Sequence, residues 1–233
     1  MIEGTVTGDG ENPDRAANDY TAQRWTVDAG SWTIETAADA LVDTVFIAGH
    51  NLAGKLVTIL TSDDTVSAMV LRASFTPTDN SAIFVMINNA GTPYTIRRVR
   101  VTVAGTDNAV AIIRAGVSLQ MEQPFYAGHT PATKARVTEG EQSFSETGQW
   151  QGRTVKRVAL SPAYNWRHLT KTWYDANFEP FAQTLPANPF AIAGNPSAMP
   201  DDVAWGWTNQ DARPVTMGLV NLMEVSMQVT GLR

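Results

Sequence analysis

Hydrophobic and polar residues alternate with a period of two along most of the chain, a pattern typical of β-strands with one buried face. One case is YTIRRVRVTV at 94–103, where Val99, Val101 and Val103 share one face with Arg97, and the clearest is the last element, where Met223, Val225, Met227 and Val229 alternate with polar residues. In the first half we expect six strands: 41–48, 55–61, 68–75, 81–87, 94–103 and 110–117. Short strands separated by turn residues predict a sandwich or a barrel.

The turn GHNLAG at 49–54 joins the first two of these strands and contains one of three histidines. Gly49, Asn51 and Gly54 are residue types that adopt positive φ readily. We expect His50 to be a turn histidine that bonds to the local backbone, in preference to a ligand-binding role.

The second half combines strands with one helix. We expect strands at 137–146, 153–160, 203–208 and 223–230, and 117–121 as a strand shared with the first half. A helix is expected from Leu169, capped by Thr170 or Thr172. Its apolar face would carry Tyr174, Phe178 and Phe181. The proline-rich segment 185–202 is expected to be irregular and stiff, and to lie as an arm on neighbouring chains.

These patterns predict a mainly all-β protein with two domains. Residues 1–117 would form a β-sandwich, and residues 118–233 a β-rich assembly domain with a short helix near 170–184. The distribution of aromatic residues supports this division, because 13 of the 20 lie in the second part.

Composition narrows the range of functions. The 233 residues have a formal net charge of −6, which disfavours nucleic-acid binding. No apolar run is long enough to cross a membrane, and the acidic start of the chain does not resemble a signal peptide. There is no cysteine. Arginine outnumbers lysine by 13 to 4, a bias that is found at protein interfaces.

The chemistry for catalysis is sparse. His50, His129 and His168 form no metal-ligand motif, and phosphate-binding and nucleophile motifs are absent. Carboxylate pairs could serve a glycosidase, but we expect them to be solvated; they are Asp63 with Asp64, Glu139 with Glu141, and Asp201 with Asp202. We therefore expect no enzyme, no cofactor and no metal.

The aromatic side chains leave two alternatives open. They can fill the core or a subunit interface, or they can stack on sugars. The expected interface residues are Trp150, Trp166, Trp173, Tyr174, Trp205, Trp207, Arg153 and Arg157. As sugar contacts we expect two turn residues, Trp25 and Trp150.

Several segments, in this order, resemble tailed-bacteriophage virion proteins. The first part is similar to their galactose-binding-like (discoidin-type) jelly rolls, in NDYTAQRW, Trp32, DTVFIAGHNLAG, RRVRVTV and IIRAGVSLQM. The second part is similar to the partner domain of these proteins, in GQWQGRTVKR, WYDANFEPF, NPFAIAGNP and MPDDVAWGW. Together the segments span most of residues 18–232.

This resemblance implies a structural tail-tip or baseplate protein located in the virion. It implies homo-oligomeric assembly, contacts with neighbouring tail proteins and no catalysis. The alternative is a carbohydrate-binding module of the same particle that contacts a host-surface glycan. A hydrolase of cell-wall glycan is the least supported hypothesis, because the sequence contains no positioned pair of acids.

Overall fold

The chain folds into two compact units. The structure is a computed structural model that describes residues 1–66, 68–125, 128–208, 211–218 and 221–232. Unit 1 comprises Met1–Ser118 and Pro196–Pro200, and unit 2 comprises Leu119–Asn195 and Asp201–Arg233. Both units consist mainly of antiparallel strands, and within the described residues the α-helical turns α1 and α2 lie in unit 2. The predicted fold class is therefore confirmed.

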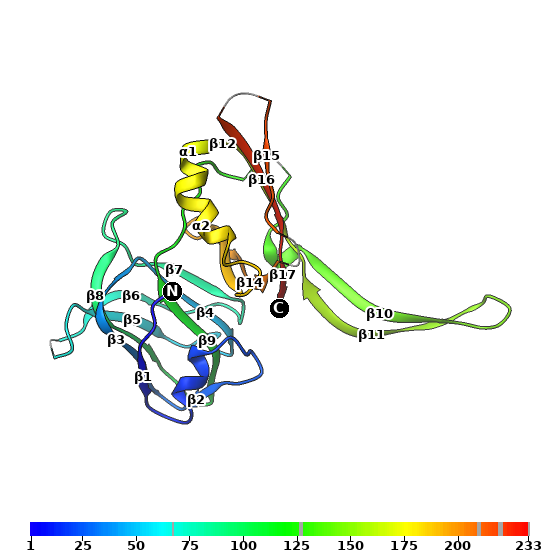
Figure 1. Ribbon diagram of the computed structural model, residues 1–233. Coiled ribbons are helices and arrows are strands. Elements are labelled where there is room, and N and C mark those ends of the chain that lie inside the picture. The colour runs from blue at the N-terminus through cyan, green and yellow to red at the C-terminus, as the bar shows by residue number, and fades with distance from the viewer. Residues whose placement is uncertain (67, 126–127, 209–210, 219–220, 233) are drawn as a thin grey trace. The chain divides into compact units, whose positions relative to one another are not determined.

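Unit 1 is a sandwich of two antiparallel sheets (Figure 1). One sheet has the order β1-β3-β8-β5-β6 and the other β2-β9-β4-β7. The elements are β1 (Thr5–Gly8), η1 (Pro13–Ala17), β2 (Trp25–Val27), β3 (Gly30–Val42), β4 (Thr44–His50), β5 (Val57–Ser62), β6 (Val70–Phe75), β7 (Ile83–Met86), β8 (Tyr94–Val103) and β9 (Asn108–Gly116).

The residues that alternate with polar ones in the sequence of β8 form part of the core of unit 1. Val99, Val101 and Val103 of β8 are each at most 1% exposed, and they pack with side chains from both sheets. Two tryptophans complete this core, and each satisfies its indole N–H internally. Trp25 donates to the Asp9 carbonyl at 2.7 Å, and Trp32 donates to the Pro13 carbonyl at 2.9 Å.

The strand predicted at 41–48 is two strands, because the chain breaks at Asp43. The Asp43 side chain is buried and accepts hydrogen bonds from the Thr44 hydroxyl and from the backbone N–H and hydroxyl of Ser118. The break also changes the face on which Leu41 lies, since Leu41 is exposed while Val42 is fully buried. Leu41 therefore does not share the inner face with Val45.

Unit 2 contains a five-stranded sheet of order β10-β11-β17-β14-β13 and a three-stranded sheet of order β12-β16-β15. Its elements are η2 (Ala132–Lys134), β10 (Arg136–Phe144), β11 (Trp150–Leu160), β12 (Ala163–Thr170), α1 (Lys171–Trp173), η3 (Tyr174–Phe178), α2 (Glu179–Ala182), β13 (Phe190–Asn195), β14 (Met199–Trp207), β15 (Pro214–Thr216), β16 (Leu222–Gln228) and β17 (Thr230–Leu232).

The helical segment of unit 2 begins where the sequence predicts. The Thr170 hydroxyl accepts a hydrogen bond from the Trp173 N–H at 3.3 Å, which caps α1. Pro180 lies in the first turn of α2, directly after the π-helical turn η3, so the irregular turn accommodates the missing N–H donor. Tyr174 and Phe178 are buried against β12 and β16.

Two expectations for unit 2 were wrong. Segment 185–202 is not an irregular arm, because β13 and the start of β14 lie within it as neighbouring strands of the five-stranded sheet. Pro189 precedes β13 and Pro196 follows it, whereas Pro200 is the second residue of β14. Residues 117–121 form no strand, because the Ser118 N–H bonds to the Asp43 carboxylate instead of to a strand partner.

Candidate functional site

The most exposed part of unit 2 is the two-stranded ribbon formed by β10 and β11, which extends away from the rest of this unit (Figure 1). All nine residues of β10 are exposed, and so are those of β11 up to Val158, except for Gly152. Only the end of β11 has a second neighbour, where Leu160 pairs with Gly231 of β17. At about 3.3 Å per residue, the ribbon is roughly 30 Å long.

The register of the two strands separates the side chains into two faces. Thr138 lies opposite Val158, Gly140 opposite Val155, Gln142 opposite Arg153, and Phe144 opposite Trp150. Paired residues of an antiparallel ribbon point to the same side. These eight residues therefore share one face, which we call the apolar face because Phe144, Trp150, Val155 and Val158 are its largest exposed hydrophobic side chains.

On the opposite face, which we call the charged face, acidic side chains form ion pairs with basic side chains of the same ribbon. Arg157 donates two hydrogen bonds to the Glu139 carboxylate, at 2.6 and 2.7 Å. Lys156 forms an ion pair with Glu141. The hydrogen bonds from Arg157 lower the pKa of Glu139, and the same contact raises the pKa of Arg157. Glu139 and Glu141, one of the three carboxylate pairs considered for glycosidase chemistry, are thus each paired with a cation.

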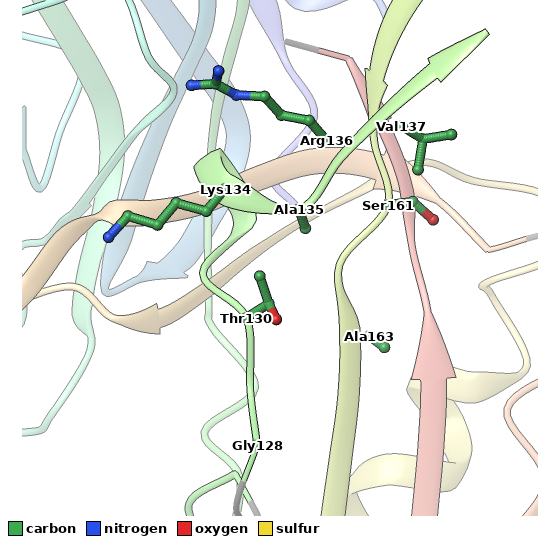
Figure 2. A pocket seen from close by; sticks show the side chains of 8 residues that line it. All are labelled: Gly128, Thr130, Lys134, Ala135, Arg136, Val137, Ser161 and Ala163. Carbon is green, nitrogen blue, oxygen red and sulfur yellow. The ribbon is translucent and has the colours of Figure 1, made fainter.

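A shallow pocket of about 270 Å³ lies at the root of the ribbon (Figure 2). Its walls come from the segment before β10, from the start of β10 and from the link between β11 and β12. The lining residues are Gly128, Thr130, Lys134, Ala135, Arg136, Val137, Ser161 and Ala163. None of these is a carboxylate or a histidine, so the pocket contains no acid–base pair.

A buried polar cluster anchors the segment that leads into the ribbon. The Asp202 carboxylate, which is 1% exposed, accepts a hydrogen bond from His129 Nε2 at 2.7 Å and another from the Ala132 N–H at 2.7 Å. The His129 ring also stacks on Phe125 and on Tyr164, with centroid distances of 4.5 and 5.1 Å. Residues 129–132 are therefore tied to β14 and β12.

Tyr164 extends this cluster but does not act as an acid at ordinary pH. Its ring is 2% exposed, and its hydroxyl has no hydrogen-bond partner among the described residues. Burial raises the pKa of Tyr164, and the nearby Asp202 carboxylate raises it further. The hydroxyl stays protonated, so the cluster is structural in character.

His50 of unit 1 bonds to the local backbone, as predicted. Its Nδ1 accepts from the Leu52 N–H at 3.2 Å, and its Nε2 lies 2.8 Å from the Ser81 carbonyl. Burial is the main cause that lowers the pKa of His50. A neutral ring that accepts at one nitrogen and donates at the other satisfies both contacts, so His50 serves to join two loops.

The structure separates the predicted site residues into exposed and buried sets. Trp150 is 65% exposed and Trp207 is 37% exposed. Arg153 and Arg157 are exposed on the ribbon, on the apolar and charged faces respectively. Trp173 is partly buried against the core of unit 2. The buried residues are Trp166, Tyr174 and Trp205, each 3% exposed.

The expectation that Trp25 is an exposed sugar contact was wrong. Trp25 is fully buried, and its indole N–H is taken by the Asp9 carbonyl. The polar residues that precede it in the sequence suggested a surface turn, but β2 pairs with β9 and directs the ring into the sandwich.

Sequence reasoning did not single out Phe144, Val155 or Val158. The available signal was weak, because Val155 and Val158 are three residues apart in the sequence and share a face only through the register shift between them. Within the described ranges, no three histidine or acidic side chains are grouped as a metal site. No helix in those ranges has the length and hydrophobicity needed to cross a membrane.

Comparison with known proteins gives matches only among solved structures. No protein family and no curated protein matches the chain. A family 32 carbohydrate-binding module in complex with 4,5-unsaturated mannuronic acid is 18% identical, with a TM-score of 0.42, and the match covers 49% of this chain and 95% of the module.

A pectin-binding module is also 18% identical, with a TM-score of 0.42 and coverage of 51% and 92%. A family 32 module from C. perfringens in complex with galactose is 14% identical, with a TM-score of 0.41 and coverage of 48% and 91%. In each case the likeness concerns the fold of about half of the chain.

Proposed function

We propose that this protein is a non-enzymatic structural component of a bacteriophage virion, in the tail tip or baseplate, and that it assembles through the β10–β11 ribbon. The observation that carries the proposal is the apolar face of that ribbon. An isolated two-stranded ribbon is marginally stable in water, and it becomes stable when a hydrophobic face is covered. Phe144 and Trp150 are more than half exposed in the single chain. A contiguous exposed apolar patch of this kind often marks an interaction site.

The arrangement of the remaining chemistry agrees with this role. The carboxylates of the ribbon are neutralised by Arg157 and Lys156, and the buried His129–Asp202 pair holds a backbone segment in place. The resemblance of segments within residues 18–232 to tail proteins is the reason for proposing a location in the tail.

The direct test is mass spectrometry of purified virions, combined with immunogold labelling of tails. We expect the chain in the particle, with label at the tail tip or baseplate. Phage carrying Phe144→Ser with Trp150→Ser should assemble poorly. Phage carrying Glu141→Gln with Lys156→Gln, which alter only the charged face, should assemble normally. Absence of the chain from purified virions would refute the proposal.

A second candidate is glycan binding by the ribbon tip, which one observation favours. Trp150 and Phe144 form an exposed aromatic pair on the same face as Gln142 and Arg153, so flat rings adjoin an amide and a guanidinium group. Such rings offer an apolar surface next to polar atoms, the combination that suits sugar stacking.

This candidate is tested by titrating host-surface oligosaccharides against the wild-type protein and Trp150→Ala. Binding that Trp150→Ala abolishes and Glu141→Gln preserves would support it. No binding by the wild-type protein, or equal binding by both variants, would eliminate the ribbon tip as a glycan site.

A further inference from the structure

The apolar face of the ribbon lacks a cover, and its chemistry identifies what would cover it. We propose that it packs against the apolar face of the same ribbon in a second copy of this chain. The inference rests on the proposed assembly function and deepens it by naming the partner. It does not depend on where in a particle the protein is placed.

Side-chain orientation favours contact through faces over contact through edges. The pairing of β10 with β11 has two register shifts, between Glu139 and Gly140 and between Ser143 and Phe144, so the ribbon is irregular along its length. Such irregularities, together with charged side chains, hinder strand addition at an edge. The apolar face has no comparable protection, because Val155 and Val158 are 54% and 39% exposed.

The middle of the apolar face is shaped for close approach. Gly140 has no side chain, and the Arg153 guanidinium lies across it and donates to the Thr138 carbonyl at 3.1 Å. Arginine laid flat in this way presents its planar group to a partner, and arginine and aromatic residues are enriched at protein interfaces. The rings of Phe144 and Trp150 lie on one side of this centre and Val158 lies on the other, while Val155 pairs with Gly140 itself.

Charge favours a second copy over a charged partner of either sign. Residues 136–160 contain four positive and three negative side chains, a net charge of +1, whereas the whole chain has a net charge of −6. Because the ion pairs of the charged face are closed within the ribbon, two ribbons can meet with little repulsion. The apolar face itself carries a single cation, Arg153, which donates to the Thr138 carbonyl, so an acidic or a basic partner would find no extended set of charges to pair with.

The area is adequate for a stable contact between two copies. With about 150–250 Å² for a large aromatic side chain, the exposed fractions of Phe144, Trp150, Val155 and Val158 give roughly 400 Å² per copy. Two such faces with their polar rims reach the ~1,000 Å² expected of a biological interface. Sheets that pack in this way lie about 10 Å apart.

An isologous contact also predicts which residues meet. In a twofold pair, if residue i of one copy contacts residue j of the other, residue j of the first copy also contacts residue i of the second. Residues at the centre of the face therefore contact the same residues in the second copy. Val155 lies midway along the ribbon on the apolar face, whereas its sequence neighbour Thr154 points to the charged face. Because the protein has no cysteine, a single introduced thiol reports on one position alone.

The first test is light scattering of the purified full chain over a concentration series. We expect an oligomer of at least twice 25.3 kDa. The variant Phe144→Ser with Trp150→Ser should raise the dissociation constant at least about tenfold. The matched control, Glu141→Gln with Lys156→Gln, should leave it unchanged. A monomer at every concentration, or an oligomer indifferent to the Phe144 and Trp150 substitutions, would overturn the inference.

The second test is oxidative cross-linking of single-cysteine variants, which remains informative if the serine variants fold poorly. Val155→Cys should form a disulfide-linked dimer, and Thr154→Cys should not. Equal cross-linking of both variants, or of neither, would contradict face-to-face pairing. A monomeric chain found in purified virions would refute the pairing but keep the proposed function, and an oligomer absent from virions would do the reverse.

Discussion

The Asp202 carboxylate offers a stringent test of how the root of the ribbon is held. In Asp202→Ala the Ala132 N–H loses its acceptor, and so does His129 Nε2. A buried polar group left without a partner costs about 1–3 kcal/mol. Since the variant also removes a buried carboxylate that was costly to desolvate, we expect a net loss of about 2–4 kcal/mol from the unfolding free energy of unit 2.

The matched variant Asp202→Asn separates hydrogen bonding from charge. An asparagine carbonyl can still accept from the Ala132 N–H, so we expect a loss of only about 1 kcal/mol. At about 4 °C per kcal/mol for a domain of this size, Asp202→Ala should lower Tm by roughly 8–16 °C. Urea titration followed by tryptophan fluorescence measures the loss of unfolding free energy in both variants, and a thermal scan with the same signal measures Tm. Proteolysis within residues 128–135 reports on the local loosening of this segment.

Gly194 provides an internal check on the same geometry. A Cβ atom at this position would lie 2.0 Å from Asp202 Oδ2, so Gly194→Ala should destabilise the wild-type chain. In the Asp202→Ala background that clash is gone, and the two substitutions should cost less together than the sum of their separate effects. Asp202→Ala within about 0.5 kcal/mol of wild type, or full additivity, would refute this account of the cluster.

Three further predictions concern single residues. Folding lowers the pKa of His50, so as the pH falls the unfolded chain binds this proton before the folded chain does. In urea titrations the unfolding free energy of unit 1 should therefore decrease below about pH 6.5, by up to ~1.4 kcal/mol per pH unit. The variant His50→Gln should show a weaker pH dependence. Trp25→Ala should cost about 3–5 kcal/mol by urea titration, and a neutral result would contradict its burial. Thr170→Ala should lose about 1 kcal/mol in the same assay, whereas Thr170→Ser should not.

Strand positions were predictable wherever one face of a strand lies on the core. In β16 the buried residues Met223, Val225 and Met227 alternate with outward polar residues, and the structure has the same pattern. The helical segment at 171–182 was equally predictable, since its capping residue and its apolar residues lie close to one another in the sequence. In these elements the local signal and the tertiary environment agree.

The failures have a common cause, which is a partner far away in the sequence. The break at Asp43 depends on Ser118, 75 residues later, and the burial of Trp25 depends on pairing with β9. The strand β13 in a proline-rich segment depends on its neighbour β14. No local pattern encodes these contacts, so propensity and periodicity alone placed these segments incorrectly.

The β10–β11 ribbon shows why the candidate site was harder to predict than the fold. Val155 and Val158 in β11 lie among polar residues much as Val225 and Met227 do in β16, yet the first pair is exposed and the second is buried. The difference is what packs on each strand: aromatic rings of Tyr174 and Phe178 cover the β16 sheet, whereas the described chain provides no cover for the ribbon. Amphipathic patterning therefore indicates that a strand has one apolar face, and only the three-dimensional structure shows that on the ribbon this face is left uncovered by the described chain.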